Sequence, residues 1–201
     1  MVRGWIVTAL MVVLVGADRG AGSELTVVWV DIGLSRRVDQ PYARREVSRM
    51  LACAGATVEW LVPRPAGDFR SDAFKLVFLA DDPRRRTHPP MGEAQRNGRP
   101  GTAWIMYSSI EAVLQRGDVP FGHELSLAVA RVAAHELVHL LTPGRGHQRA
   151  GLMKAALDRE MLVALRMELD AGTCLEVASA VTPSLATAGE SMSSAVTAPV
   201  R

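Results

Sequence analysis

The segment between residues 135 and 147 holds the side chains with the clearest capacity for chemistry. His135, Glu136 and His139 form the pattern His-Glu-x-x-His. On a helix, residues four apart lie on one face, so both imidazoles can reach one cation while Glu136 projects beside them. Two imidazole nitrogens are typical zinc ligands, and the neighbouring carboxylate is placed to act as a general base. The pattern therefore predicts a zinc site with catalytic capacity.

The helix that carries this pattern is expected to be buried. After Glu124, which begins the segment, and up to residue 141, only Ser126, Arg131 and the three residues of the pattern interrupt an apolar or alanine-rich run. Such a run predicts a helix that is buried on nearly every side. Ionisable groups in that setting are destabilising unless they are paired or bound to a metal. Structural histidines satisfied within the core are the alternative to a zinc site.

A hydrolytic zinc site needs a third protein ligand and leaves one position for water. His147 follows His139 by eight residues, across a turn at residues 142–146 that is rich in Pro and Gly. Because eight residues can span up to about 26 Å, His147 can fold back to the metal, and it is the favoured third ligand. Glu160, on a predicted helix, is the alternative. Its position near the start of that helix also suits an exposed carboxylate favoured by the helix dipole.

The segment HELVHLLTPGRGHQRAGLM, residues 135–153, resembles the zincin metallopeptidases and, more narrowly, the metzincins. The resemblance implies one catalytic Zn²⁺ ion bound by His135, His139 and His147. It further implies that Glu136 is the general base and that Met153 forms a methionine turn beneath the metal. Seven residues separate the second and third histidines, where the usual metzincin motif has five. This spacing resembles that of small secreted bacterial zincin-like proteins.

The resemblance also implies a mechanism and a place for the substrate. In metzincins an antiparallel edge strand pairs with the substrate backbone, and residues 102–107 would be that strand. Zinc lowers the pKa of its bound water from 15.7 to about 7, while Glu136 accepts the water proton and passes it to the leaving amine. Tyr107 and His123 are candidate oxyanion stabilisers, and their spacing favours neither. In the gluzincin branch a glutamate on a second helix completes the site, which is the role that Glu160 would take.

The remaining segments predict an α+β, zincin-like fold, in which a mixed twisted sheet precedes a buried active-site helix and a C-terminal helix. Apolar, β-branched runs predict strands at residues 25–32, 57–62, 74–80 and 102–107. Helical periodicity and helix-stop residues predict helices at residues 42–54, 109–115, 124–141 and 154–169. A right-handed crossover should make the first two strands parallel. Prolines, glycines and arginines in residues 81–100 predict a long surface loop in which His88 is solvated.

The composition fits a globular chain with one domain. The 201 residues are 48% apolar, and a net charge of +2 argues against nucleic acid as a partner. Residues 1–23 are predicted to be a signal peptide, because an apolar run follows Arg3 and is too short to span a bilayer. An uncleaved anchor is the alternative. The metallopeptidase domain is expected at residues 24–175, followed by a disordered Ala/Ser/Thr-rich tail at residues 176–201.

An exported chain with two cysteines can form one disulfide. Cys53 and Cys174 are the pair, and a buried thiol with a free thiol is the alternative.

The predicted function is a secreted or periplasmic zinc metalloendopeptidase that acts on peptide or protein substrates, with no stable membrane insertion after signal cleavage. The alternative is a non-catalytic, extracytoplasmic zinc-binding protein that uses the same fold to bind a partner. Glu136 favours the enzyme, since a structural zinc site has no use for a general base.

Overall fold

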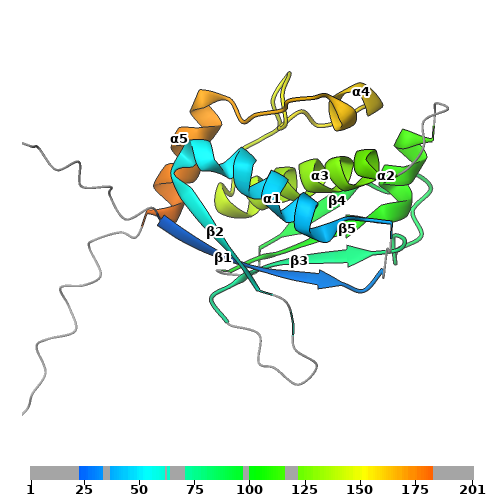
Figure 1. Cartoon of the computed structure of the whole chain (residues 1–201), viewed down its shortest axis with the longest axis horizontal. Helices are drawn as coiled ribbons and strands as arrows, with labels where there is room; N and C mark the ends of the chain where they lie inside the picture. Colours follow the sequence, from blue (N-terminus) through cyan, green and yellow to red (C-terminus); the bar gives the residue numbers. More distant parts are fainter. Residues whose placement is uncertain are drawn as a thin grey trace, which may run out of the picture.

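The computed structural model describes residues 23–33, 37–61, 63, 71–96, 100–115 and 122–182. Residues 1–22 of the predicted signal peptide lie outside the described residues, as do residues 183–201 of the predicted tail. Figure 1 shows α1 and α3 side by side on one face of a five-stranded sheet. The elements are β1 (Ser23–Asp31), α1 (Gln40–Leu51), the 3₁₀ turn η1 (Ala52–Ala54), β2 (Ala56–Leu61), β3 (Phe74–Leu79), β4 (Gly92–Gln95), β5 (Thr102–Met106), α2 (Tyr107–Leu114), α3 (His123–Leu141), α4 (Arg159–Val163) and α5 (Ala171–Val181).

The sheet has the strand order β2-β1-β3-β5-β4 and is mixed. Strands β2, β1, β3 and β5 are parallel to one another, as the sequence predicts for β1 and β2. Strand β4 runs antiparallel to β5. The core lies between this sheet and the helices α1 and α3. Alternate residues of β1, including Val27 and Trp29, are buried against these helices, and the Trp29 ring stacks on Phe78 of β3 at 3.8 Å between centroids. The predicted mixed sheet with helices packed on it is therefore present.

The edge strand is not the one expected from the sequence. Residues 102–107 were expected to form an antiparallel edge, but β5 lies inside the sheet and is parallel to β3. The edge is β4, within residues 81–100, where the sequence predicts only a surface loop. The four residues of β4 show no apolar alternation. The side chains of this strand are not fully buried, and backbone pairing with β5 holds it in the sheet. His88 in this segment is exposed, as predicted.

Helix α3 is the central helix of the fold, and it is buried over most of its 19 residues. Its start and end lie within one residue of the predicted bounds. Arg131 on this helix is fully buried, and its guanidinium donates hydrogen bonds to the backbone carbonyls of Met161, at 2.7 Å, and of Ala164. These carbonyls belong to α4 and to the residue that ends it. The buried cation therefore fixes the C-terminal end of α4 against α3.

The prediction of a long C-terminal helix at residues 154–169 is wrong in its length. The structure has only the short helix α4, with Asp158 as its N-cap accepting from the backbone N–H of Met161 at 2.9 Å. Of the apolar stripe that the sequence predicts for this helix, Leu157 and Leu169 are buried, but Leu165 is fully exposed. Because carbonyls at the end of α4 bond to Arg131 on α3, the chain leaves the helix there instead of continuing it.

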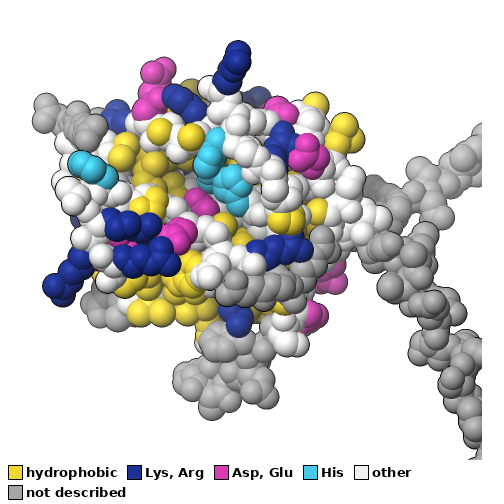
Figure 2. All heavy atoms as spheres, turned by 180° about the vertical axis from the view of Figure 1, so that it is seen from behind, with side chains coloured by type: hydrophobic (Ala, Val, Ile, Leu, Met, Phe, Trp, Pro, Cys, Tyr) yellow, Lys and Arg dark blue, Asp and Glu magenta, His cyan; other side chains and the backbone are white. Residues whose placement is uncertain are grey.

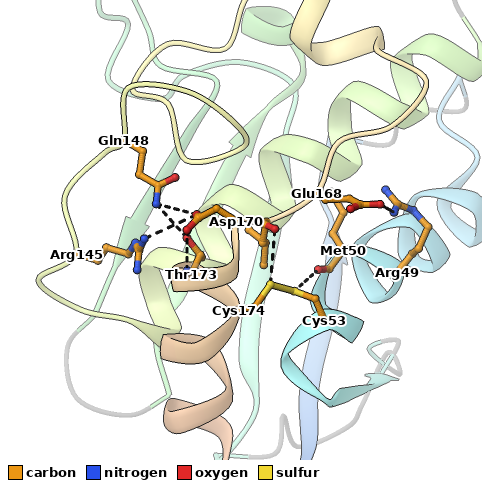
Figure 3. The surroundings of a disulfide bond; sticks show 10 residues. Arg49, Met50, Cys53, Arg145, Gln148, Glu168, Asp170, Thr173 and Cys174 are labelled. Carbon is orange, nitrogen blue, oxygen red and sulfur yellow. Dashed lines mark hydrogen bonds and ion pairs between the residues drawn. A yellow bond between two sulfur atoms is a disulfide. The ribbon is translucent and has the colours of Figure 1, made fainter.

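The last helix, α5, extends past the predicted domain boundary. It runs to Val181, so residues 176–181, which were assigned to a disordered tail, are helical, and Val177 is fully buried. A disulfide joins Cys174 of α5 to Cys53 of η1, which confirms the predicted pairing (Figure 3). Among the described helices, none combines the length and the apolar character needed to cross a bilayer.

Candidate metal centre

Three imidazoles converge at the C-terminal half of α3. His135 and His139 lie one turn apart on this helix, and their Nε2 atoms are 3.0 Å apart. His147 comes from the segment after α3, and its Nε2 lies 3.3 Å from that of His139. The ligand atoms of all three side chains lie within 4.8 Å of one another. The structure thus brings together the three histidines that the sequence singles out.

The donor set fits a zinc ion. Tetrahedral zinc with Zn–N bonds of about 2.0 to 2.1 Å holds two ligand nitrogens about 3.3 Å apart, close to the observed spacings. His135 Nδ1 lies 2.7 Å from the backbone carbonyl oxygen of Leu152, so Nδ1 carries the proton and Nε2 presents its lone pair. Burial lowers the pKa of His135, and burial followed by the two neighbouring imidazoles lowers the pKa of His139 to about 4. Neutral imidazole is the form that binds metal.

The chain between the second and third histidines turns back toward α3. Pro143 and Gly144 follow the helix end, and Gly144 has a φ of 88°, which favours glycine. A second turn at Gly151, with a φ of 76°, brings the backbone back to α3 at Leu152. Met153 is buried beside Leu152, and its carbonyl accepts from the backbone N–H of Gln148 at 2.7 Å. Met153, the methionine of the predicted turn, therefore directly follows the residue whose carbonyl contacts His135.

The side chain of Glu136 projects from α3 toward the edge strand β4. The residue is 7% exposed, and its carboxylate accepts a hydrogen bond from the backbone of Ala94 in β4. Burial raises the pKa of Glu136 to about 8. A Cβ atom placed on Gly92 would lie 2.5 Å from the Glu136 Cγ, so β4 approaches this side chain closely and leaves no room for a side chain at residue 92. The backbone of β4 therefore fixes the orientation of Glu136.

A cleft of about 400 Å³ opens beside the imidazoles and Glu136. Its walls come from the chain leading into β4, from α2, from α3 and from the segment after the methionine turn. The residues that line it include Met91, Gly92, Ser109, Val113, Val132, His135, Glu136, His147, Lys154 and Leu157. Figure 2 shows histidine side chains gathered on this face, next to apolar side chains. The cleft is large enough to hold part of a peptide next to the predicted ligands and base.

The other candidate residues lie away from this centre. Tyr107 is buried, and its hydroxyl donates a hydrogen bond to Asp31 Oδ2 at 3.2 Å. His123 is the first residue of α3 and packs on the Tyr42 ring, at 4.4 Å between centroids. Neither side chain lines the cleft, so the structure supports neither as an oxyanion stabiliser. Glu160 is exposed on α4 and is not part of the converging group.

The sequence did not point to the contacts that orient Glu136. Gly92 and Ala94 belong to a segment that lacks a strand pattern, and their role depends on backbone approach rather than on side-chain chemistry. A glycine that follows Pro89 and Pro90 so closely is typical of a loop, which hides this role. Only a map of strand pairing could have revealed it.

Substituting Gly92 with alanine should displace the Glu136 carboxylate, because the new methyl group would occupy its position. Misplacement of a catalytic group by about 1 Å costs about 100-fold in rate, and we expect that loss in kcat/KM with zinc affinity unchanged. Gln95→Ala, at an exposed position of the same strand, is the matched control and should keep the wild-type rate. Equal rates for Gly92→Ala and the control would contradict the assigned role of β4.

Alanine substitution at the two candidate third ligands should have opposite results. His147→Ala removes an imidazole from the converging group and is expected to weaken zinc binding by at least about 10-fold. Glu160→Ala changes an exposed side chain and should leave zinc affinity unchanged. Competition with a chromogenic chelator measures both affinities. The reverse result would assign the third ligand to Glu160.

Comparison with known proteins gives a likeness of fold. No protein-family model matches the chain, and no curated protein matches its sequence. The structure resembles that of archaemetzincin from Methanopyrus kandleri, with a TM-score of 0.55 and 12% identity, over 81% of this chain and 98% of that one. A GM1-bound AB5 holotoxin gives a TM-score of 0.45 with 11% identity, over 80% of this chain and 79% of that one. The chain thus resembles archaemetzincin in fold, and it carries a group of three histidines that can hold a metal.

Proposed function

We propose that the protein is a secreted zinc metallopeptidase that cleaves peptide bonds. The observation that carries this proposal is the convergence of three imidazole Nε2 atoms beside a buried carboxylate at one cleft. The likeness to archaemetzincin supports the same function at the level of fold. Three protein ligands leave a coordination position for water, as in catalytic zinc sites, whereas structural sites are usually closed by a fourth protein ligand.

In the proposed reaction His135, His139 and His147 hold the zinc ion. When bound, the ion lowers the pKa of a water molecule to about 7 and polarises the carbonyl of the scissile bond. Glu136 accepts the proton of the attacking water and delivers it to the amine nitrogen of the leaving peptide. The hydrogen bond from the backbone of Ala94 and the close approach of Gly92 keep the Glu136 carboxylate at the cleft during both transfers.

The substrate backbone is proposed to pair with β4. In the described part of the chain this strand pairs with β5 alone, so its other edge can accept an extended peptide as a further strand. Gly92 of β4 lines the cleft next to Glu136, which would bring a paired peptide close to the predicted base. We therefore infer that β4 takes the role that the sequence assigned to residues 102–107.

The proposed location is outside the cytoplasm. A disulfide between Cys53 and Cys174 is typical of proteins that fold in an oxidising compartment. The apolar run at residues 5–17 supports export as a signal peptide. Mass analysis of the protein secreted by an expressing cell should give a mature chain that begins near residue 18 or residue 24.

Metal analysis combined with a cleavage assay tests the proposed function. The purified mature protein should contain equimolar zinc, and a broad peptide library incubated with it should acquire new termini. Zinc binding without cleavage would instead favour the non-catalytic zinc-binding protein. Absence of bound zinc after dialysis against a zinc-containing buffer would contradict both functions.

A further inference from the structure

All three imidazoles depend on one segment, residues 143–153, which we call the ligand loop. The loop carries His147 itself. Its Leu152 carbonyl accepts the hydrogen bond from His135 Nδ1, and the backbone of Arg145 hydrogen-bonds the His139 ring. Partners of this kind set the orientation of metal-binding histidines, and their loss typically costs 10-fold to 100-fold in metal affinity. The position of the ligand loop therefore decides whether the three Nε2 atoms converge.

Two side chains of the ligand loop attach it to the start of α5. Gln148 Nε2 donates to Asp170 Oδ2 at 2.8 Å and to Thr173 Oγ1 at 3.2 Å. The Arg145 guanidinium lies 3.9 Å from Asp170 Oδ2 and forms an ion pair with Glu176. Figure 3 shows Arg145 and Gln148 directed toward Asp170 and Thr173. The side chains of Arg145 and Gln148 thus both contact Asp170 at the start of α5.

Asp170 also begins α5, where its Oδ1 accepts from the backbone N–H of Thr173 at 3.1 Å as the N-cap. One oxygen of the carboxylate therefore caps the helix, while the other accepts from Thr173 Oγ1 and also from Gln148 of the ligand loop. Asparagine can retain the cap, because its side-chain oxygen caps helices as well as that of aspartate. It cannot retain the negative charge beside Arg145. The two roles of this residue can therefore be separated by one substitution.

The helix that holds the loop is itself cross-linked to the rest of the domain. Cys174, four residues after Asp170, forms the disulfide with Cys53 in η1, the turn that follows α1, and α1 packs along α3. A closed path therefore runs from α3 through α1 and the disulfide to α5, and from Asp170 through the ligand loop back to the imidazoles on α3. In this path the disulfide fixes the support on which the third histidine depends.

We propose that Asp170 is a positioning residue of the metal centre, and that it acts with the Cys53–Cys174 disulfide to hold the ligand loop in its metal-binding position. The proposal rests on the proposed zinc site but not on peptidase activity. It goes beyond the ligands and the base because it makes zinc affinity depend on α5. Asp170 contacts neither the ion site nor the cleft and acts through Arg145 and Gln148.

Zinc affinity of the folded full-length protein, measured by competition with a chromogenic chelator, tests the proposal. Asp170→Asn is expected to weaken zinc binding by about 10-fold or more. Glu168→Gln makes the same chemical change two residues away, at an exposed carboxylate that pairs with Arg49 and does not face the loop, and should bind zinc as the wild type does. A Cys53→Ser, Cys174→Ser double variant should also bind more weakly. Far-UV circular dichroism confirms that each variant is folded at the assay temperature.

A second variant and a second measurement keep the test decisive if Asp170→Asn folds poorly. Arg145→Met removes the other side of the contact and should weaken zinc binding without touching the cap of α5. Hydrogen exchange of the zinc-free protein should increase across residues 143–153 in both variants. If Asp170 serves only as the N-cap of α5, its substitution would lower the melting temperature but leave zinc affinity and the hydrogen exchange of residues 143–153 unchanged. That result would overturn the proposal.

The outcomes also separate this proposal from the proposed function. Wild-type protein that binds zinc and cleaves peptides, together with Asp170→Asn and Arg145→Met variants of wild-type affinity, would overturn only the role of Asp170. Wild-type protein that binds no zinc would overturn both. Zinc binding that weakens in both variants, with no peptide cleavage by the wild type, would support the role of Asp170 and contradict the peptidase.

Discussion

Replacing Glu136 with alanine is expected to reduce kcat/KM for peptide cleavage by about 100-fold to 10,000-fold while the protein still binds equimolar zinc. Removing a positioned general base costs this much in rate, because the attacking water must then lose its proton without a partner. The carboxylate is not one of the three converging ligand side chains, so metal binding does not depend on it. Cleavage of a peptide selected from a library, with metal analysis of the same preparation, measures both effects.

The matched control for this substitution is Glu124→Ala on the same helix. Glu124 lies near the start of α3, where its carboxylate is 3.4 Å from the Arg159 guanidinium and far along the helix from the imidazoles. Its loss should leave both the zinc content and the cleavage rate unchanged. Wild-type cleavage by Glu136→Ala would show that this carboxylate is not the base, and loss of zinc from it would show that the side chain has a role in metal binding.

Removing the disulfide should produce the largest change in stability. The bridge between Cys53 and Cys174 joins residues 121 positions apart, and the chain-entropy model assigns about 4 to 5 kcal/mol to a loop of this length. The Cys53→Ser, Cys174→Ser double variant should therefore unfold at a clearly lower denaturant concentration. Equilibrium unfolding in urea, with the slope fitted separately for each protein, gives the difference in free energy.

The comparison for this prediction is the wild-type protein unfolded with its disulfide intact. A decrease of less than about 1 kcal/mol would show that the bridge does little to restrict the unfolded chain. The same double variant reports on the metal centre, because α5 supports the ligand loop. Weaker zinc binding at a temperature where the variant is fully folded would separate this effect from the loss of stability.

Residues with strong local patterns gave the most accurate predictions. The run of β-branched residues at 25–32 and the apolar helix at 124–141 are reproduced within about two residues, because a strand or helix buried on both sides must be apolar along its length. The spacing of His135, Glu136 and His139 depends only on helix geometry, so it could be interpreted without a structure. These features place the candidate centre on α3.

The remaining features depend on contacts between distant segments. β4 forms because β5 offers it a backbone to pair with, and its own four residues carry no strand signal. Helix α4 ends where the buried Arg131 binds its carbonyls, although the apolar spacing beyond it continues. The contacts of Asp170 with Arg145 and Gln148 likewise join two segments that lie apart in the sequence. No local pattern could predict any of these.

The most direct test of the central claim is peptide-library cleavage by one preparation divided into three portions. The first portion is loaded with zinc, the second is stripped with a chelator and dialysed, and the third is stripped and then given equimolar zinc. Because His135, His139 and His147 are proposed to hold the ion needed for hydrolysis, the first and third portions should generate the same new peptide termini, and the second should generate none. Equal cleavage by the stripped protein, or no cleavage by the zinc-loaded protein, would contradict a zinc metallopeptidase.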